Sequence, residues 1–187
     1  MYKRQVQVKR QRLPGHKRAE AKNQGFRVSR KKTRAYRPEI KQNIKVNNNN
    51  SSAELKPNNQ FSIDFEIDFP SKLVSKQSCQ LQLVNGNYKT DIASARTFGF
   101  ERDVDMLRSN GLALGGSLDN AVVVGESKIL NSDGLRFKDE FVRHKILDSI
   151  GDLYLAGAPI QGYFLGNKSG PVSYTHLRAH ETKANLV

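Results

Sequence analysis

Apolar and polar residues alternate strictly along QFSIDFEIDF, residues 60–69, where every second position is Phe or Ile. This period of two is typical of a strand with one buried face. The alternation returns in SCQLQLVNGNY through Leu81 and Leu83, and it ends at Asn85-Gly86, a dipeptide that favours a tight turn. The pattern therefore predicts two neighbouring strands, the second of which ends in a turn.

Weak strand character over residues 39–46 leads into NNNNSS, residues 47–52, which reads as a loop or hairpin tip. After residue 90 helical periods appear. The first predicted elements are a short helix from Thr90 and Asp91 to about Ala95, an extended RTFGF segment, and an amphipathic helix in ERDVDMLRSNG that ends at Gly111. A strand AVVV follows, and another strand comes after a Gly-Glu-Ser turn. The last predicted elements are a long helix over 137–156 and a strand over 161–165. Strands followed by mixed elements with antiparallel-type turns predict an α+β fold, a two-layer domain with a largely antiparallel sheet packed against helices.

The net charge of +13 comes from the beginning of the chain. Residues 1–45 hold 16 of the 31 Lys and Arg residues and 2 of the 18 Asp and Glu residues; the other 142 residues hold 15 basic and 16 acidic side chains. Because apolar residues are few there, we expect 1–38 to be a basic, unstructured and non-native leader. A basic arm also suits nucleic acid, so a non-catalytic binding module with a nucleic-acid-binding arm is the alternative function. With only Tyr2, Phe26 and Tyr36 as aromatic platforms, we expect no nucleic-acid partner.

The sequence predicts neither a membrane span nor an intrachain disulfide bond. No run of 18 apolar residues and no secretory leader occur, so we expect no membrane span. The single cysteine, Cys79, cannot form an intrachain disulfide, which fits a cytoplasmic location.

The long predicted helix carries ionisable residues on one face. His144 and Asp148 are four residues apart, and Asp152 continues the same face one turn further. An imidazole and a carboxylate at this spacing can bind Zn²⁺ when a third ligand comes from elsewhere and water fills the open position. Lys145 is placed to stabilise an oxyanion and Asp152 to orient a histidine. A structural His–Asp pair is the alternative interpretation.

The last residues, 171–187, continue no pattern. His176 and His180 have the spacing of a helical zinc pair, but the residues between them include no glutamate to act as a base. VSYTHLRAHET resembles translated sequencing adapter, as MYKRQ does at the start of the chain. We therefore expect three segments: the leader, a folded domain over 39–170, and a non-native tail.

Several longer stretches resemble the C-terminal domain of the UDP-3-O-acyl-N-acetylglucosamine deacetylase family, zinc enzymes of lipid A biosynthesis in Gram-negative bacteria. They are SARTFGFERDVDMLRSNGLALGGSLDNAVVV, NSDGLRFKDEFVRHKILDSIGDLYLAG and GNKSG. The resemblance runs from about Ala53 to Gly170. It implies the family's second-domain fold and hydrolysis of the acetamide of a UDP-linked acylated amino sugar by a cytoplasmic, monomeric enzyme that requires Zn²⁺.

The resemblance also implies roles for individual residues. His144 and Asp148 match zinc ligands. The catalytic matches are Thr97, which helps hold the oxyanion, Lys145, which contacts substrate near the metal, and Asp152, which pairs with a catalytic histidine. The substrate-binding matches are Asp68 and Phe69 for the UDP moiety, and Val104, Ala113, Gly116 and Val123 for the passage that takes the acyl chain. For the valines of that passage the alternative is core packing, and for Gly116 it is turn geometry.

Three departures from the family pattern matter. The family's first domain, which supplies the third zinc ligand and the catalytic glutamate, does not match any part of this sequence. The histidine that follows KSG in the family is replaced by Pro171, and the basic leader does not align. We therefore expect a fragment that binds zinc poorly and is inactive alone.

Overall fold

The computed structural model describes residues 39–84, 86–155, 159–171, 173–174 and 177. The leader with its nucleic-acid-binding alternative, the turn residue Asn85, and both His176 and His180 lie outside these described residues. What was predicted of them stays a prediction.

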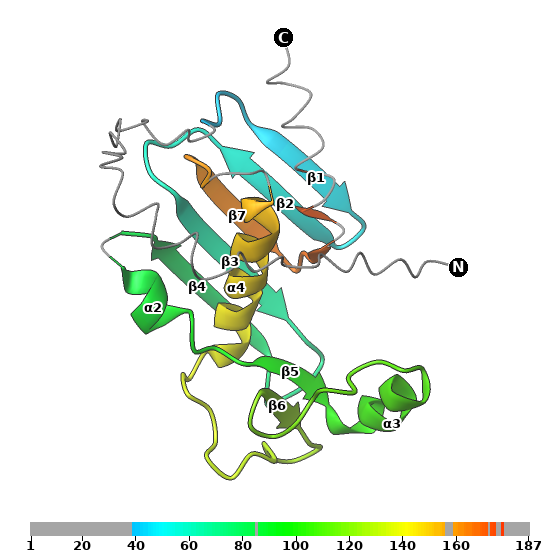
Figure 1. Ribbon diagram of the computed structural model, residues 1–187. Coiled ribbons are helices and arrows are strands. Elements are labelled where there is room, and N and C mark those ends of the chain that lie inside the picture. The colour runs from blue at the N-terminus through cyan, green and yellow to red at the C-terminus, as the bar shows by residue number, and fades with distance from the viewer. Residues whose placement is uncertain (1–38, 85, 156–158, 172, 175–176, 178–187) are drawn as a thin grey trace, which may run out of the picture. The chain divides into compact units, whose positions relative to one another are not determined.

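The main sheet is mixed and mostly antiparallel, which confirms the predicted α+β class. Its five strands are β1 (Ile44–Asn48), β2 (Ser51–Lys56), β3 (Ser62–Asp68), β4 (Lys76–Gln82) and β7 (Tyr163–Asn167). Their order across the sheet is β1-β2-β7-β3-β4, and only the β3–β7 pair is parallel (Figure 1). β7, the last of these five strands along the chain, thus lies in the centre of the sheet, between two antiparallel hairpins.

The NNNNSS run is a hairpin tip, as predicted. Asn48 and Ser51 are paired across β1 and β2, so two residues form the turn. Asn49 adopts a φ of 47°, in the left-handed region that Asn tolerates better than most residues. Asn is therefore well suited to this tight connection.

The alternation in residues 60–69 produces the buried face of β3. Ile63, Phe65 and Ile67 are at most 2 % exposed, and their polar neighbours face away. They pack beneath the long helix α4 (Glu140–Tyr154), which lies across β3 and β4 and buries Phe141 and Ile146 against them. One sheet face and one helix face therefore enclose the core.

A second, smaller sheet is parallel, which the antiparallel-type turns predicted after residue 90 did not anticipate. β5 (Thr97–Phe100) and β6 (Ala121–Val124) pair in parallel, and helix α3 (Glu101–Ser109) lies in the connection between them. Parallel neighbours need a crossover of this kind, which a hairpin turn cannot supply. The strand expected after the Gly-Glu-Ser turn is reduced, in the described part of the chain, to a bridge between Val124 and Ile129.

Two helix boundaries also differ from the prediction. The short helix α2 spans Asn87–Asp91 and ends where the predicted helix begins. The Asn87 side chain accepts a hydrogen bond from the Val84 N–H and donates one to the Gln82 carbonyl, which ties the start of α2 to the end of β4. α4 starts at Glu140 rather than at 137, because residues 137–139 form a turn.

Two residues of the predicted tail lie in the core. Tyr174 is 1 % exposed and Leu177 is fully buried. The Tyr174 ring packs edge-on against Phe164 with centroids 5.7 Å apart, and its hydroxyl donates to the Ser169 carbonyl at 3.1 Å.

Among the described residues, no helix combines the length and the apolar character needed to cross a bilayer.

Candidate metal site

His144 and Asp148 share one face of α4, as their spacing predicts. The His144 Nε2 atom lies 3.3 Å from Asp148 Oδ1, and the two side chains are 16 % and 35 % exposed. Solvent therefore reaches the carboxylate, and the pair is not enclosed beneath aliphatic side chains. The helix alone brings the two groups together, because residues four apart are neighbours on its surface.

The other ring nitrogen of His144 is held by the main chain. Nδ1 lies 3.0 Å from the carbonyl oxygen of Ala95, the residue that comes two positions before β5 begins. In the neutral ring, with Nδ1 protonated and donating to this carbonyl, Nε2 has a free lone pair for a ligand. The contact orients the imidazole and joins α4 to the segment that leads into β5.

The charges around this pair favour an ionised carboxylate. Lys145 Nζ lies 3.1 Å from Asp148 Oδ2, so the two carboxylate oxygens have separate partners. Burial alone would raise the pKa of Asp148, but its hydrogen bond with His144 and the charges of His144 and Lys145 lower it. Burial likewise opposes the charged form of His144, yet hydrogen bonds with Asp148 and Ala95 hold its pKa above the usual range.

The distance between the two candidate ligand atoms suits zinc. In a tetrahedral site with bonds of about 2.0–2.1 Å, two ligand atoms are about 3.3–3.4 Å apart, which is the separation of His144 Nε2 and Asp148 Oδ1. A zinc site needs at least one more protein ligand. Within the described ranges, no three His, Cys, Asp or Glu side chains come together to hold a metal ion. The residues fit half of a zinc site.

The three predicted catalytic residues lie on α4 and at the start of β5. Lys145 contacts Asp148, and Asp152 follows one turn further along α4, where it is half-buried. Thr97 is the exposed first residue of β5, two residues after Ala95, the residue that contacts His144. The structure thus places Thr97 on the segment that orients the histidine. Its catalytic role stays a prediction, as do those of Lys145 and Asp152.

Asp68 and Phe69 lie at the end of β3, where they have different surroundings. Asp68 is exposed, and Lys168 Nζ lies 2.6 Å from its Oδ2, which lowers the pKa of Asp68. The Phe69 ring packs against Phe98 and Phe100 of β5, with centroids 5.5 and 6.1 Å away. Through these ring contacts, Phe69 joins the main sheet to the smaller one. Binding of UDP by these two residues stays a prediction.

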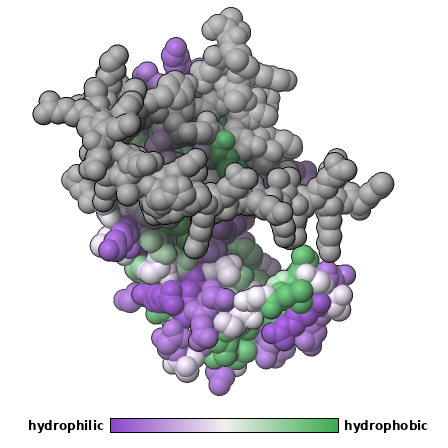
Figure 2. Space-filling model, viewed as in Figure 1, coloured by the Kyte–Doolittle hydropathy of each residue, from purple (hydrophilic) through white to green (hydrophobic). Residues whose placement is uncertain are grey.

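The four residues matched to the acyl passage all belong to the β5–α3–β6 unit. Val104 in α3 and Val123 in β6 are half-buried, whereas Ala113 and Gly116 are exposed in the loop between them. Ala113 has a φ of 53°, which is uncommon for a residue with a Cβ. Figure 2 shows hydrophobic residues on the surface at the α3 end of this unit. Four large apolar side chains are at least half exposed there: Met106, Leu112, Leu114 and Leu118.

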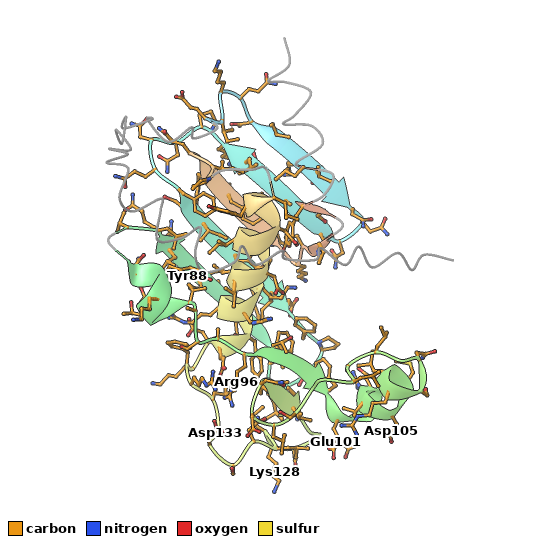
Figure 3. All side chains as sticks on the ribbon, in the orientation of Figure 1. Tyr88, Arg96, Glu101, Asp105, Lys128 and Asp133 are labelled. Carbon is orange, nitrogen blue, oxygen red and sulfur yellow. The ribbon has the colours of Figure 1, made fainter. Side chains whose placement is uncertain are left out.

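A buried ion network close to His144 and Asp148 could not be inferred from the sequence. Arg96 is paired with Glu140 through Nε and Oε1 at 2.9 Å, and with Asp133 through Nη1 and Oδ2 at 2.9 Å. Figure 3 shows Arg96 close to the loop that carries Asp133. The Glu140 side chain is fully buried and that of Arg96 is 3 % exposed. The sequence contains no signal for this pair, because nothing in it marks which charges are buried.

Comparison with known proteins identifies the same family that the sequence motifs resemble. The sequence model of the family described as UDP-3-O-acyl N-acetylglycosamine deacetylase matches residues 19–180. Among curated proteins, one from Psychrobacter cryohalolentis is 54 % identical over 133 residues, which are 70 % of this chain and 42 % of that protein. One from Shewanella violacea is 52 % identical over 133 residues (70 % and 44 %), and one from Methylococcus capsulatus is 47 % identical over 147 residues (78 % and 48 %). All three are named UDP-3-O-acyl-N-acetylglucosamine deacetylase, and this chain spans less than half the length of each.

Proposed function

Because the chain belongs to the UDP-3-O-acyl N-acetylglycosamine deacetylase family, we propose that it carries part of the active site of a zinc-dependent amide hydrolase. The substrate is UDP-3-O-acyl-N-acetylglucosamine, and the bond that is hydrolysed is its acetamide. The reaction is the committed step of lipid A biosynthesis. The names of the relatives support this substrate, since each is a deacetylase of that compound.

The observation that carries the proposal is the arrangement of His144 and Asp148. Their ligand atoms are separated by the distance expected across a tetrahedral zinc ion, and the Ala95 carbonyl fixes the imidazole so that Nε2 faces the carboxylate. When bound, Zn²⁺ supplies Lewis-acid chemistry that polarises the acetamide carbonyl and makes water a better nucleophile.

The residues around the pair have distinct tasks in this proposal. Asp148 holds Lys145 in place through its second oxygen, which keeps the ammonium group beside the reacting carbonyl. Thr97 donates its hydroxyl hydrogen to the oxyanion that forms as the carbonyl carbon becomes tetrahedral. Asp152 orients a histidine that this chain lacks, because Pro171 stands at the matching position.

The substrate's two ends are bound by different elements. Asp68 and Phe69 at the end of β3 contact the UDP moiety. The acyl chain follows the β5–α3–β6 unit, which carries Val104, Ala113, Gly116 and Val123 and also the exposed side chains of Leu112, Leu114 and Leu118. An acyl chain covering those leucines removes apolar surface from water, at about 25 cal/mol per Å².

The third zinc ligand and the general base come from the part of the relatives that this chain does not match. The chain alone is therefore an inactive fragment in this proposal. The complete enzyme acts as a monomer in the cytoplasm, a reducing compartment where the free thiol of Cys79 is stable.

A chimaera tests the proposal. The aligned residues of the Psychrobacter cryohalolentis relative are replaced by the matching residues of this chain up to Gly170, so that the relative keeps its own residue at the position of Pro171, and deacetylation of UDP-3-O-acyl-N-acetylglucosamine is measured with Zn²⁺. We expect turnover by the chimaera, and loss of both turnover and bound zinc in His144→Ala and in Asp148→Ala. A folded His144→Ala chimaera that keeps its zinc and its rate would refute the assignment.

A further inference from the structure

One peptide group, between Ala95 and Arg96, contacts two side chains of α4 through its two ends. Its carbonyl oxygen lies 3.0 Å from His144 Nδ1, and its N–H donates to Glu140 Oε1 at 2.9 Å. Glu140 and His144 are four residues apart on the helix, so both reach the same segment from one face. The peptide therefore lies between a buried carboxylate and a candidate metal ligand.

Glu140 is held firmly in this position. Oε1 also accepts from Arg96 Nε at 2.9 Å, while Oε2 accepts from Arg96 Nη2 at 3.2 Å and from the Arg136 N–H at 2.6 Å. Burial alone would raise the pKa of Glu140, but the hydrogen bonds from Arg96 and Arg136 lower it. The side chain is thus a fixed, buried carboxylate at neutral pH.

A carboxylate bonded to a peptide N–H makes the carbonyl of that peptide a stronger acceptor, because bonds in series polarise one another. In metal sites, carboxylates or carbonyls beside a ligating histidine set its tautomer and its basicity. We propose that Glu140 is a positioning residue that acts on His144 through the Ala95–Arg96 peptide, so that Nδ1 keeps its proton and Nε2 stays free for the metal. This rests on the ligand role given to His144 in the proposed function.

The test measures the tautomer of neutral His144 in the full chain, without metal, by long-range ¹H–¹⁵N NMR of ¹⁵N-histidine-labelled protein. The spectra are taken above the pH range in which the imidazole titrates, and His144→Gln identifies the resonance. The neutral ring carries its proton either on Nδ1, facing Ala95, or on Nε2, facing Asp148. We expect Glu140→Gln to lower the ratio of the first form to the second by about twofold or more, because the carbonyl becomes a weaker acceptor.

Asp133→Asn is the matched control. Asp133 is 59 % exposed and bonds the same guanidinium, but it does not contact the shared peptide, so its removal leaves the ratio unchanged. If Glu140→Gln fails to fold because Arg96 loses its buried partner, the double variant Arg96→Met, Glu140→Gln removes both charges and keeps the backbone N–H. We expect the double variant to show the same fall in the ratio of the Nδ1-protonated to the Nε2-protonated form of His144.

An equal tautomer ratio in the folded wild type and the folded Glu140 variant overturns the positioning role. The proposed function fails by a different result, namely a chimaera that keeps its zinc after His144→Ala. Because the tautomer is read without zinc, the two failures are distinguishable.

Discussion

Arg96 Nε lies 2.9 Å from Glu140 Oε1, and neither side chain is more than 3 % exposed. This pair ties the segment before β5 to the first turn of α4. Removing one partner of a buried ion pair leaves the other charge unpaired, at a cost of about 3–5 kcal/mol. We therefore expect Glu140→Gln to lower the free energy of unfolding by about that amount, measured by urea denaturation at pH 7.

The network offers its own control. Asp133 bonds the same guanidinium at 2.9 Å but is 59 % exposed, and exposed pairs contribute about 0–1 kcal/mol. Asp133→Asn is expected to stay within that range. Equal losses in the Asp133 and Glu140 variants would show that burial does not set the strength of these contacts.

The same carboxylate predicts a pH dependence. Burial acts to raise the pKa of Glu140, but the hydrogen bonds from Arg96 and Arg136 hold it below the usual value of 4.5. A pKa that is lower in the folded state gives stability that is present above the unfolded pKa and lost as the pH falls through the folded one. We expect the difference in unfolding free energy between wild type and Glu140→Gln to be full at pH 7 and to shrink below about pH 4.5.

Urea denaturation of both proteins in steps from pH 7 to pH 3 measures this difference. The other carboxylates with lowered pKa values, such as Asp68 and Asp148, are present in both proteins and cancel in the comparison. A difference that stays constant across the range would contradict the assignment to Glu140.

Zinc binding by the chain alone is expected to be weak. His144 and Asp148 provide two ligands where a stable site needs three or four. Isothermal titration with Zn²⁺ should show no micromolar site that depends on His144. A micromolar dissociation constant that is lost in His144→Ala would mean that a further ligand is present in this chain.

Thr97→Val in the chimaera tests the oxyanion role. Loss of one oxyanion donor lowers kcat by about 10²–10³, and Thr97 is exposed, so the fold should not change. Steady-state kinetics with circular dichroism as a check of folding measures this. The control is Thr90→Val, at an exposed threonine of α2; similar losses in both variants would remove the special role of Thr97.

Gly166 is required by the close approach of β7 and β3. A Cβ at this position would lie 2.5 and 2.6 Å from two ring atoms of Phe65, its register partner. Gly166→Ala should therefore destabilise the protein by about 1–3 kcal/mol. Gly151 in α4 has open space around its Cβ position, so Gly151→Ala should be neutral or stabilising by up to about 1 kcal/mol. Thermal unfolding of both variants measures these changes in stability. A Gly166→Ala variant as stable as the wild type would contradict the predicted clash.

Local patterns predicted the elements better than their partners. The alternation around Phe65 and the apolar positions around Ile146 are short-range signals, and both segments form the expected strand and helix. The parallel pairs β3–β7 and β5–β6 join residues far apart in sequence, which no local period reports. The start of α2 depends on two hydrogen bonds of the Asn87 side chain, so the helix forms earlier than the Thr-Asp signal indicates.

The contact between His144 and Asp148 could be predicted because a helix fixes the distance between residues four apart. His144 and Asp148 meet for that reason, and the resemblance to the deacetylases assigns them a metal. The Ala95 carbonyl and the Glu140 carboxylate could not be predicted, since both meet their partners only through the tertiary fold.

The position of β7 has a consequence for synthesis on the ribosome. Residues 163–167 leave the ribosome after both hairpins, yet they form the strand that lies between β2 and β3 in the five-stranded sheet. A lone hairpin is marginally stable in water, so the nascent chain exposes two unpaired strand edges until this segment emerges. Ribosome-bound chains that stop short of residue 163 should thus be sensitive to proteases and dependent on chaperones, and protection should appear abruptly once β7 can insert.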